Sequence, residues 1–185
     1  MTPRQETPSI VASNKKEELF QMSCKTVWRG IEKGTFGIKI ASGYLRFLES
    51  LLDVNQKLSA EQEEVKKFLM SDKKSPVVIQ VLLYYPPDKN NKIVRQLIKK
   101  GAIVRYLYKK DEAFRMVLVD DEIHLSISDN KDNPVVHGFN CTGDEAKQLV
   151  DYFYRRFDEE FDKATELILE EDEIKLFNGH GQKLK

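Results

Sequence analysis

The chain has 185 residues, of which 41% are hydrophobic and 32% charged, a composition typical of a globular domain and not of a disordered chain. Its 30 basic residues balance its 30 acidic residues, and this lack of a basic excess argues against direct binding of nucleic acid. The two cysteines, Cys24 and Cys141, lie far apart and outside any ligand spacing, so we expect no metal site and no cofactor.

The sequence predicts no role in a membrane. The longest apolar run, residues 77–85, is far too short to cross a bilayer. Residues 1–14 lack the basic start and apolar stretch of a secretory signal. Because both cysteines are expected to stay reduced, the predicted location is the cytoplasm.

The first part of the chain reads as a tail followed by helices. Residues 1–13 are polar with two prolines and are expected to form a flexible tail, and residues 14–34 an N-terminal helix. Asn14 opens that helix, and Gly30 and Gly34 are expected to end it. A short buried strand is predicted at residues 35–41, then a leucine-rich helix through residue 58. Ser59 and Gln62 form a capping box for another helix.

Residues 77–108 have the pattern of a strand, a helix and a second strand. The near-continuous apolar run at residues 77–85 is typical of a central strand that is covered on both faces. Asn90 is expected to cap the helix that follows, and Gly101 to end it. Residues 102–108 form the next strand, so the unit predicts a parallel pair with a right-handed crossover.

The pattern changes after this unit. Residues 113–119 and 122–128 are predicted strands that meet in a hairpin at Asp120-Asp121, and residues 135–139 form one more strand. From Asp144 to Ile168, apolar residues at steps of three and four predict a long helix, followed by a C-terminal tail at residues 171–185. The expected fold is α/β, with a mixed, mostly parallel sheet flanked by helices over residues 35–170.

This order of elements resembles one half of the phospholipase D-like superfamily. The catalytic motif of that family is a His, a Lys two residues later and an Asp five residues beyond the Lys. Laid on the segment FRMVLVDD, these positions fall on Phe114, Met116 and Asp121, so only the Asp is retained. Phe cannot attack phosphorus and Met cannot neutralise a phosphate, so the resemblance implies the fold without the family's phosphodiesterase chemistry.

The resemblance also implies a function. Degenerate domains of this kind serve as effector-sensing parts of archaeal transcriptional regulators. We therefore expect a non-catalytic, ligand-sensing homodimer with a small-molecule effector and a separate DNA-binding partner protein. Two alternatives stay open: a phosphodiesterase or nuclease that uses His137 with Asp121, and an interaction module that docks through the long helix near residues 161–169.

Six residues are candidates for ligand binding, and none is assigned a catalytic role: Phe114, Met116, Asp121, Ser128, His137 and Asn140. The first two either line an apolar pocket at the former motif or pack in the core. His137 ends a strand, at the position where open α/β sheets bind ligands. The lone strand histidine His124 is expected to be packed and hydrogen-bonded. Arg105 and Arg115 lie within strands, where each requires a carboxylate or an anion, and a salt bridge is the expected outcome.

Overall fold

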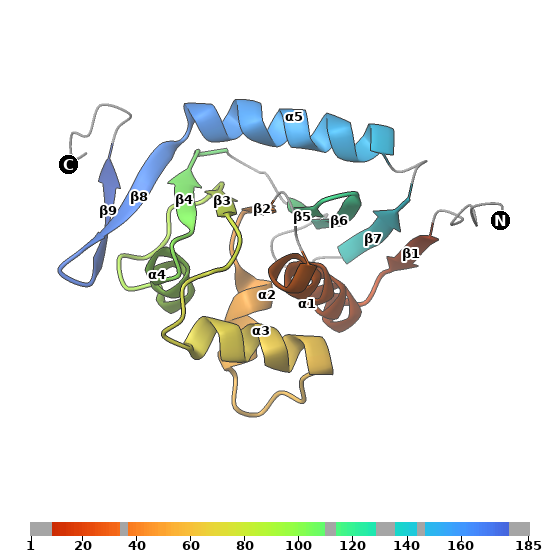
Figure 1. The fold of residues 1–185 in the computed structure, drawn as a ribbon, viewed down its shortest axis with the longest axis horizontal. Coiled ribbons are helices and arrows are strands. Elements are labelled where there is room, and N and C mark those ends of the chain that lie inside the picture. The colour runs from red at the N-terminus through yellow and green to blue at the C-terminus, as the bar shows by residue number, and fades with distance from the viewer. Residues whose placement is uncertain (1–8, 34–36, 110–113, 129–135, 144–146, 178–185) are drawn as a thin grey trace.

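The computed structural model describes residues 9–33, 37–109, 114–128, 136–143 and 147–177 (Figure 1). Within these residues nine strands form one sheet, and helices cover both of its faces. In chain order the elements are β1 (Ser9–Ser13), α1 (Lys16–Lys33), β2 (Ile38–Ser42), α2 (Arg46–Glu49), the 3-10 helix η1 (Ser50–Leu52), α3 (Ala60–Met70), β3 (Ile79–Leu83), α4 (Lys92–Lys99), β4 (Ile103–Tyr106), β5 (Phe114–Val119), β6 (Glu122–Ser128), β7 (Val136–Thr142), α5 (Lys147–Lys163), β8 (Thr165–Glu170) and β9 (Glu173–Phe177).

The sheet is mixed but mostly antiparallel, so the expectation of a mostly parallel sheet is wrong. Its strand order is β1-β7-β6-β5-β2-β3-β4-β8-β9. β2, β3 and β4 run parallel, whereas every other neighbouring pair is antiparallel. The reason is the connections: a parallel pair requires a long crossover, and helices fill the connections between β2 and β3 and between β3 and β4. The crossover predicted for residues 77–108 is confirmed.

Two apolar layers hold the sheet between its helices. Alternate residues of β5 illustrate the division, since Val117 and Val119 belong to the layer beneath α1 to α4, while Met116 and Leu118 belong to the layer beneath α5. Figure 1 shows α5 alone along one face and the other helices on the opposite face. Each strand of the centre is therefore buried on both sides, which explains its continuous apolar sequence.

α1 packs unusually close to the sheet. It continues through Gly30 to Lys33, so Gly30 does not end the helix as expected. A Cβ atom on Gly30 would lie 2.5 Å from Cγ1 of Ile38 and 2.9 Å from Cγ2 of Val119. The glycine is needed for this approach and not for a turn, and it brings the polar residues of α1 down onto β5, β6 and β7.

The local signals at the starts of α3 and α4 hold to within a residue, whereas the helix predicted before them does not. The capping box of Ser59 and Gln62 opens α3 as predicted, with both of its hydrogen bonds present. Asn91, and not Asn90, caps α4 by accepting a hydrogen bond from the Val94 amide. The leucine-rich helix predicted before residue 58 is reduced to the short α2 and η1.

Both ends of the chain contribute strands where tails were expected. Residues 9–13 form β1, which pairs with β7 because SIVAS carries the small and β-branched residues of an edge strand. The predicted long helix ends at Lys163, five residues early, because Thr165 to Glu170 pair with β4 as β8. Glu171 and Asp172 then take positive φ angles of 48° and 63° in a two-residue hairpin turn to β9. Leu167 and Leu169, expected on a docking helix, pack in the core around β4.

Within the part of the chain that the structure describes, no helix combines the length and the apolar character that crossing a membrane requires.

One buried lysine fixes the loop between α3 and β3. Nζ of Lys100 donates hydrogen bonds to the Ser71 carbonyl, to Ser71 Oγ at 2.8 Å and to the Lys73 carbonyl at 2.9 Å. It also lies 5.1 Å from the centre of the Phe68 ring. Burial lowers the pKa of Lys100, so its charge depends on these acceptors.

We expect Lys100→Met to lower the free energy of unfolding by about 2 kcal/mol, because hydrogen bonds from a charged donor are lost and the carbonyls are left unpaired. In thermal unfolding the midpoint falls by roughly 4–8 °C for a domain of this size. The control is Lys99→Met, which removes only the exposed ion pair with Asp172 and is expected to change stability by less than about 1 kcal/mol. Equal effects of the two variants would contradict the role given to Lys100.

Candidate functional site

Phe114 and Met116 pack in the layer beneath α5. Met116 is buried, and Phe114 lies 5.5 Å from the Tyr84 ring in a tilted arrangement, with the Arg156 guanidinium 5.1 Å from its centre. The side chains of Tyr84 and Arg156 therefore fill the space beside Phe114, where the expected alignment would place a ligand pocket. Phe114 and Met116 thus pack in or against the core and do not line an open apolar pocket among the described residues.

The other candidates lie apart from one another. Asp121 is exposed at the β5–β6 turn, beside a hollow of 560 Å³ that Lys39 and Lys147 also line. Ser128 ends β6, and its side chain lies outside the described residues. His137 pairs with Ile127 near the same end of β6, so six residues at about 3.3 Å each place it roughly 20 Å from Asp121. The pair proposed for a displaced phosphodiesterase site does not meet.

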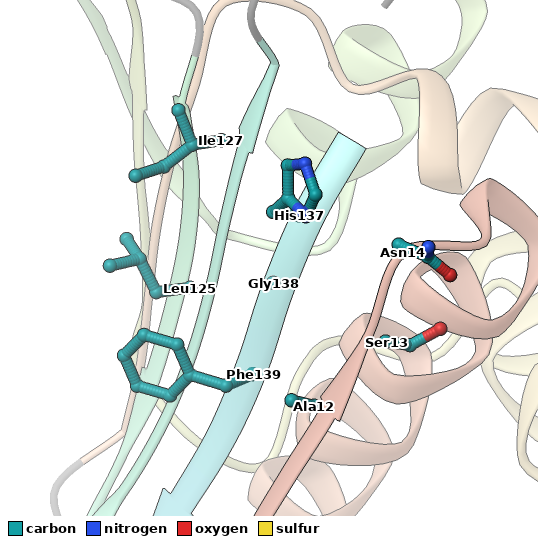
Figure 2. Close-up of a pocket in the computed structure, with 8 residues that line it drawn as sticks. All are labelled: Ala12, Ser13, Asn14, Leu125, Ile127, His137, Gly138 and Phe139. Carbon is teal, nitrogen blue, oxygen red and sulfur yellow. The ribbon is translucent and has the colours of Figure 1, made fainter. Parts of the chain in front are cut away.

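His137 belongs to an open hollow of about 540 Å³ on the outer face of β1, β7 and β6 (Figure 2). The lining is mostly apolar, and it consists of Ala12, Ser13, Asn14, Leu125, Ile127, His137, Gly138 and Phe139. Among the described residues that line it, none is a carboxylate or a second titratable group beside His137. General acid–base chemistry requires such a partner to orient the imidazole, so this hollow is a surface for packing more than for catalysis.

The opposite face of the sheet holds a buried arginine on β5. Arg115 is 8% exposed, and its guanidinium lies 4.7 Å from the centre of the Phe20 ring and 5.2 Å from that of Phe47. Among the described residues it has no carboxylate partner, and its Nε has no hydrogen-bond acceptor. Burial lowers the pKa of Arg115 to about 10, so the side chain is still a cation at neutral pH. A buried charge without a carboxylate partner is strongly unfavourable, so among the described residues the Arg115 guanidinium is poorly satisfied.

Arg115 lies at the edge of the sheet where parallel strands end. In the sheet it is opposite Ser42, the last residue of β2, on one side and Ser126 of β6 on the other. Ser42 is in turn aligned with Leu83, the last residue of β3. Open α/β sheets bind ligands at the carboxyl ends of their parallel strands, so Arg115 lies where a ligand is expected.

A hydrogen-bonded network lies next to Arg115 beneath α1. Asn140 donates through Nδ2 to Thr26 Oγ1 at 3.2 Å and to Glu122 Oε1 at 3.1 Å, and Thr26 donates to the same carboxylate at 2.7 Å. Arg29 pairs with Glu122 from the surface side. Because the Asn140 amide is committed as a donor, its Oδ1, 2.5 Å from His124 Nδ1, accepts a hydrogen bond from that nitrogen.

His124 is therefore neutral, with an unused acceptor. Burial, and then the positive charge of Arg115, lowers the pKa of His124 to about 3, although the hydrogen bond to Asn140 opposes the shift. With the proton on Nδ1, the buried Nε2 carries a lone pair that meets no donor among the described residues. Arg115 and His124 both point to the layer beneath α1. In that layer Arg115 Nε has no described acceptor, and His124 Nε2 has no described donor.

Comparison with known structures adds the fold. The structure is similar to Nuc, a phospholipase D family member from Salmonella typhimurium, with a TM-score of 0.51 and 8% sequence identity, over 86% of this chain and 98% of that one. The fold is phospholipase D-like. A second similar structure is TrmBL2, described as an archaeal chromatin protein with a novel mode of DNA binding, with a TM-score of 0.46 and 19% identity. That match covers 89% of this chain and 55% of TrmBL2, so the chain spans about half its length. No protein-family model and no curated protein matches the chain.

Laid on the sequence one residue earlier, the phospholipase D-like motif again retains only its Asp. In that alignment Ala113 takes the place of the His, Arg115 that of the Lys and Asp120 that of the Asp. The register chosen from the sequence pointed to the α5 face, so Arg115 and His124, although both were discussed, were not among the six ligand candidates. A signal was present, since Arg115 is the one charged residue in the apolar strand FRMVLV. No group of three His, Cys, Asp or Glu side chains in the described ranges could hold a metal.

Proposed function

We propose that the chain is a non-catalytic regulatory domain that senses an anionic small molecule at Arg115. The observation that carries the proposal is the buried guanidinium with no carboxylate among the described residues. A strand arginine requires either a carboxylate or an anion, and the geometry favours the anion. The neighbouring acceptor on His124 favours an anion with a hydroxyl group, such as a phosphate monoester or a hydroxy acid.

The same residues argue against hydrolysis. In one alignment of the motif the nucleophile position holds Phe114, and in the other it holds Ala113, so neither provides an attacking group. The neutral His124 donates to Asn140, is fully buried and carries a strongly lowered pKa, which makes it a poor base at pH 7. Because no side chain at the motif positions can attack phosphorus, the proposed role of the site is to bind an anion and release it unchanged.

The cellular role follows from the family resemblance. Degenerate domains of this kind act in transcriptional regulators, so we propose a transcription-related role with a DNA-binding partner protein, and a cytoplasmic location. The balance of 30 basic and 30 acidic residues favours a small anion over nucleic acid as the ligand of Arg115.

The experiment is a thermal-shift screen with inorganic phosphate, glucose 6-phosphate, citrate and a short DNA duplex at fixed ionic strength. Binding to the folded state at about 100 times the dissociation constant adds about 2.7 kcal/mol of stability, which raises the midpoint by roughly 5–10 °C. We expect one of the small anions to give this shift in the natural protein and none in Arg115→Met.

The control variant is Arg46→Met, which removes an exposed arginine that lies over Tyr44 and is expected to keep the shift. A shift that survives in Arg115→Met, or one given by the duplex alone, would contradict the proposal. Hydrolysis of bis(p-nitrophenyl) phosphate that disappears in Arg115→Met would instead make the protein an enzyme.

A further inference from the structure

β1 forms one edge of the sheet. It is the first strand in the order and pairs on one side with β7, and no described segment pairs with its other side (Figure 1). A free edge exposes unpaired amide and carbonyl groups that can pair with another strand. Proteins usually protect such edges with charged residues, prolines or bulges.

The two edges of the sheet are protected differently. The opposite edge strand, β9, carries Glu173 and Lys175, which pair with each other, and Glu173 also pairs with Lys89. Charges of this kind prevent a second strand from docking. β1 has the sequence SIVAS, without a charged residue or a proline. Its edge is the unprotected one.

The two faces of β1 are also incomplete. Ile10 is 68% exposed and Val11 is 53% exposed, although successive residues of a strand point to opposite faces. On one face lies the hollow of about 540 Å³ shown in Figure 2, which Ala12 lines. On the other lies a hollow of about 350 Å³, where Val11 and Met22 meet the polar and charged side chains of Glu18, Gln21, Lys25 and Glu61. A strand added beside β1 would cover apolar side chains on both faces.

We propose that this strand is β1 of a second copy of the chain, paired antiparallel and centred on Val11. In that register each Val11 is opposite the other Val11, Ile10 is opposite Ala12, and Ser9 is opposite Ser13. The pairing places a large residue against a small one and brings no like charges together, so the strand is complementary to itself. Ile10 of the second copy then lies beside Ala12, at the rim of the hollow in Figure 2. The inference does not depend on Arg115 or on the proposed function.

The first test is the mass in solution of the natural protein and of Val11→Lys, by size-exclusion chromatography with light scattering. We expect a dimer for the natural protein and a monomer for Val11→Lys, because two lysines would face each other across the two-fold axis. The matched control is Val54→Lys, a residue that is 91% exposed in a loop, which is expected to leave the dimer intact. Circular dichroism checks that both variants keep the folded spectrum, because loss of the dimer would itself lower the melting midpoint.

A monomeric natural protein, or a dimer that persists in Val11→Lys, would overturn the proposal. The register is tested by cross-linking under mild oxidation. Val11→Cys is expected to form a disulfide-linked dimer, since directly opposite residues are close enough, whereas Ile10→Cys is expected to form little, because it lies opposite Ala12. The natural cysteines Cys24 and Cys141 are buried and do not compete. Efficient linking by Ile10→Cys but not by Val11→Cys would disprove this register.

Discussion

Replacement of Arg115 by methionine is expected to make the ligand-free protein more stable, by about 1–3 kcal/mol. The guanidinium is buried among Phe20 and Phe47 without a carboxylate partner in the described residues, so its removal from water is only partly offset. The two ring contacts return about 1–2 kcal/mol each at most, less than the several kcal/mol that desolvation of an ion requires. Methionine has a similar length and fills the space with apolar atoms. Denaturant unfolding at neutral pH, without added anions, gives the comparison.

The control for this prediction is an arginine of a nearby strand that does have partners. Arg105 of β4 donates to the Phe161 carbonyl at 2.8 Å and lies within 4.0 Å of Asp162 and Glu166. Arg105→Met is expected to lower stability by about 1 kcal/mol. The opposite signs of the two effects separate a structural arginine from one held for a ligand. A loss of stability in Arg115→Met as large as in Arg105→Met would mean that Arg115 has a partner within the fold.

The stability of the protein is expected to fall as the pH is lowered below 6.5, because of His124. Its pKa is about 3 in the folded state and near 6.5 in the unfolded state, so between these values only the unfolded chain takes up the proton. A folded pKa below the unfolded one means that the stabilising contribution is complete above pH 6.5 and is lost as the pH falls. The slope for one such group is about 1.4 kcal/mol per pH unit, or about 2 kcal/mol between pH 6.5 and pH 5.

His124→Gln removes this titration. Between pH 6.5 and pH 5 the free energy of unfolding of the variant should therefore fall by about 2 kcal/mol less than that of the natural protein. The quantity compared is the slope of the unfolding free energy against pH. The contribution of the carboxylates, which titrate in both proteins, is then removed from the comparison. His137→Gln, which alters an exposed histidine of the Figure 2 hollow, is the matched control for replacing histidine by glutamine. If His124→Gln and the natural protein have the same slope, His124 is not the buried neutral group described here.

Local patterns in the sequence predicted the elements better than their arrangement. The alternation in residues 113–128 and the pair Asp120-Asp121 were sufficient for the β5–β6 hairpin, and Ser59 with Gln62 for the start of α3. The prediction of a mostly parallel sheet was wrong. The antiparallel pairs β2–β5 and β4–β8 join segments that lie far apart in the chain, so they leave no local signal in the sequence. The end of α5 was missed because apolar residues of β8 continued the helical spacing by coincidence.

The site was harder to predict for a related reason. That Arg115 requires a partner could be read from an apolar strand with a single charge, but that no described carboxylate reaches it depends on what packs across the sheet from α1 and α2. Likewise His124 was expected to be packed and hydrogen-bonded, and it is, yet its free Nε2 follows from how Asn140 divides its donors between Thr26 and Glu122. The sequence indicates which polar residues need a hydrogen-bond or ion-pair partner, whereas the packing of the folded chain decides which of them have one.

We propose that Arg115 holds an anion that the protein does not transform. The most direct test of this proposal is isothermal titration of the natural protein and of Arg115→Met with the anion that gives the largest thermal shift, at neutral pH and fixed ionic strength. We expect saturable binding of one anion per chain to the natural protein, recovery of the anion unchanged, and no measurable heat with Arg115→Met. Equal binding to both proteins, or an anion recovered as a hydrolysed product, would contradict the account.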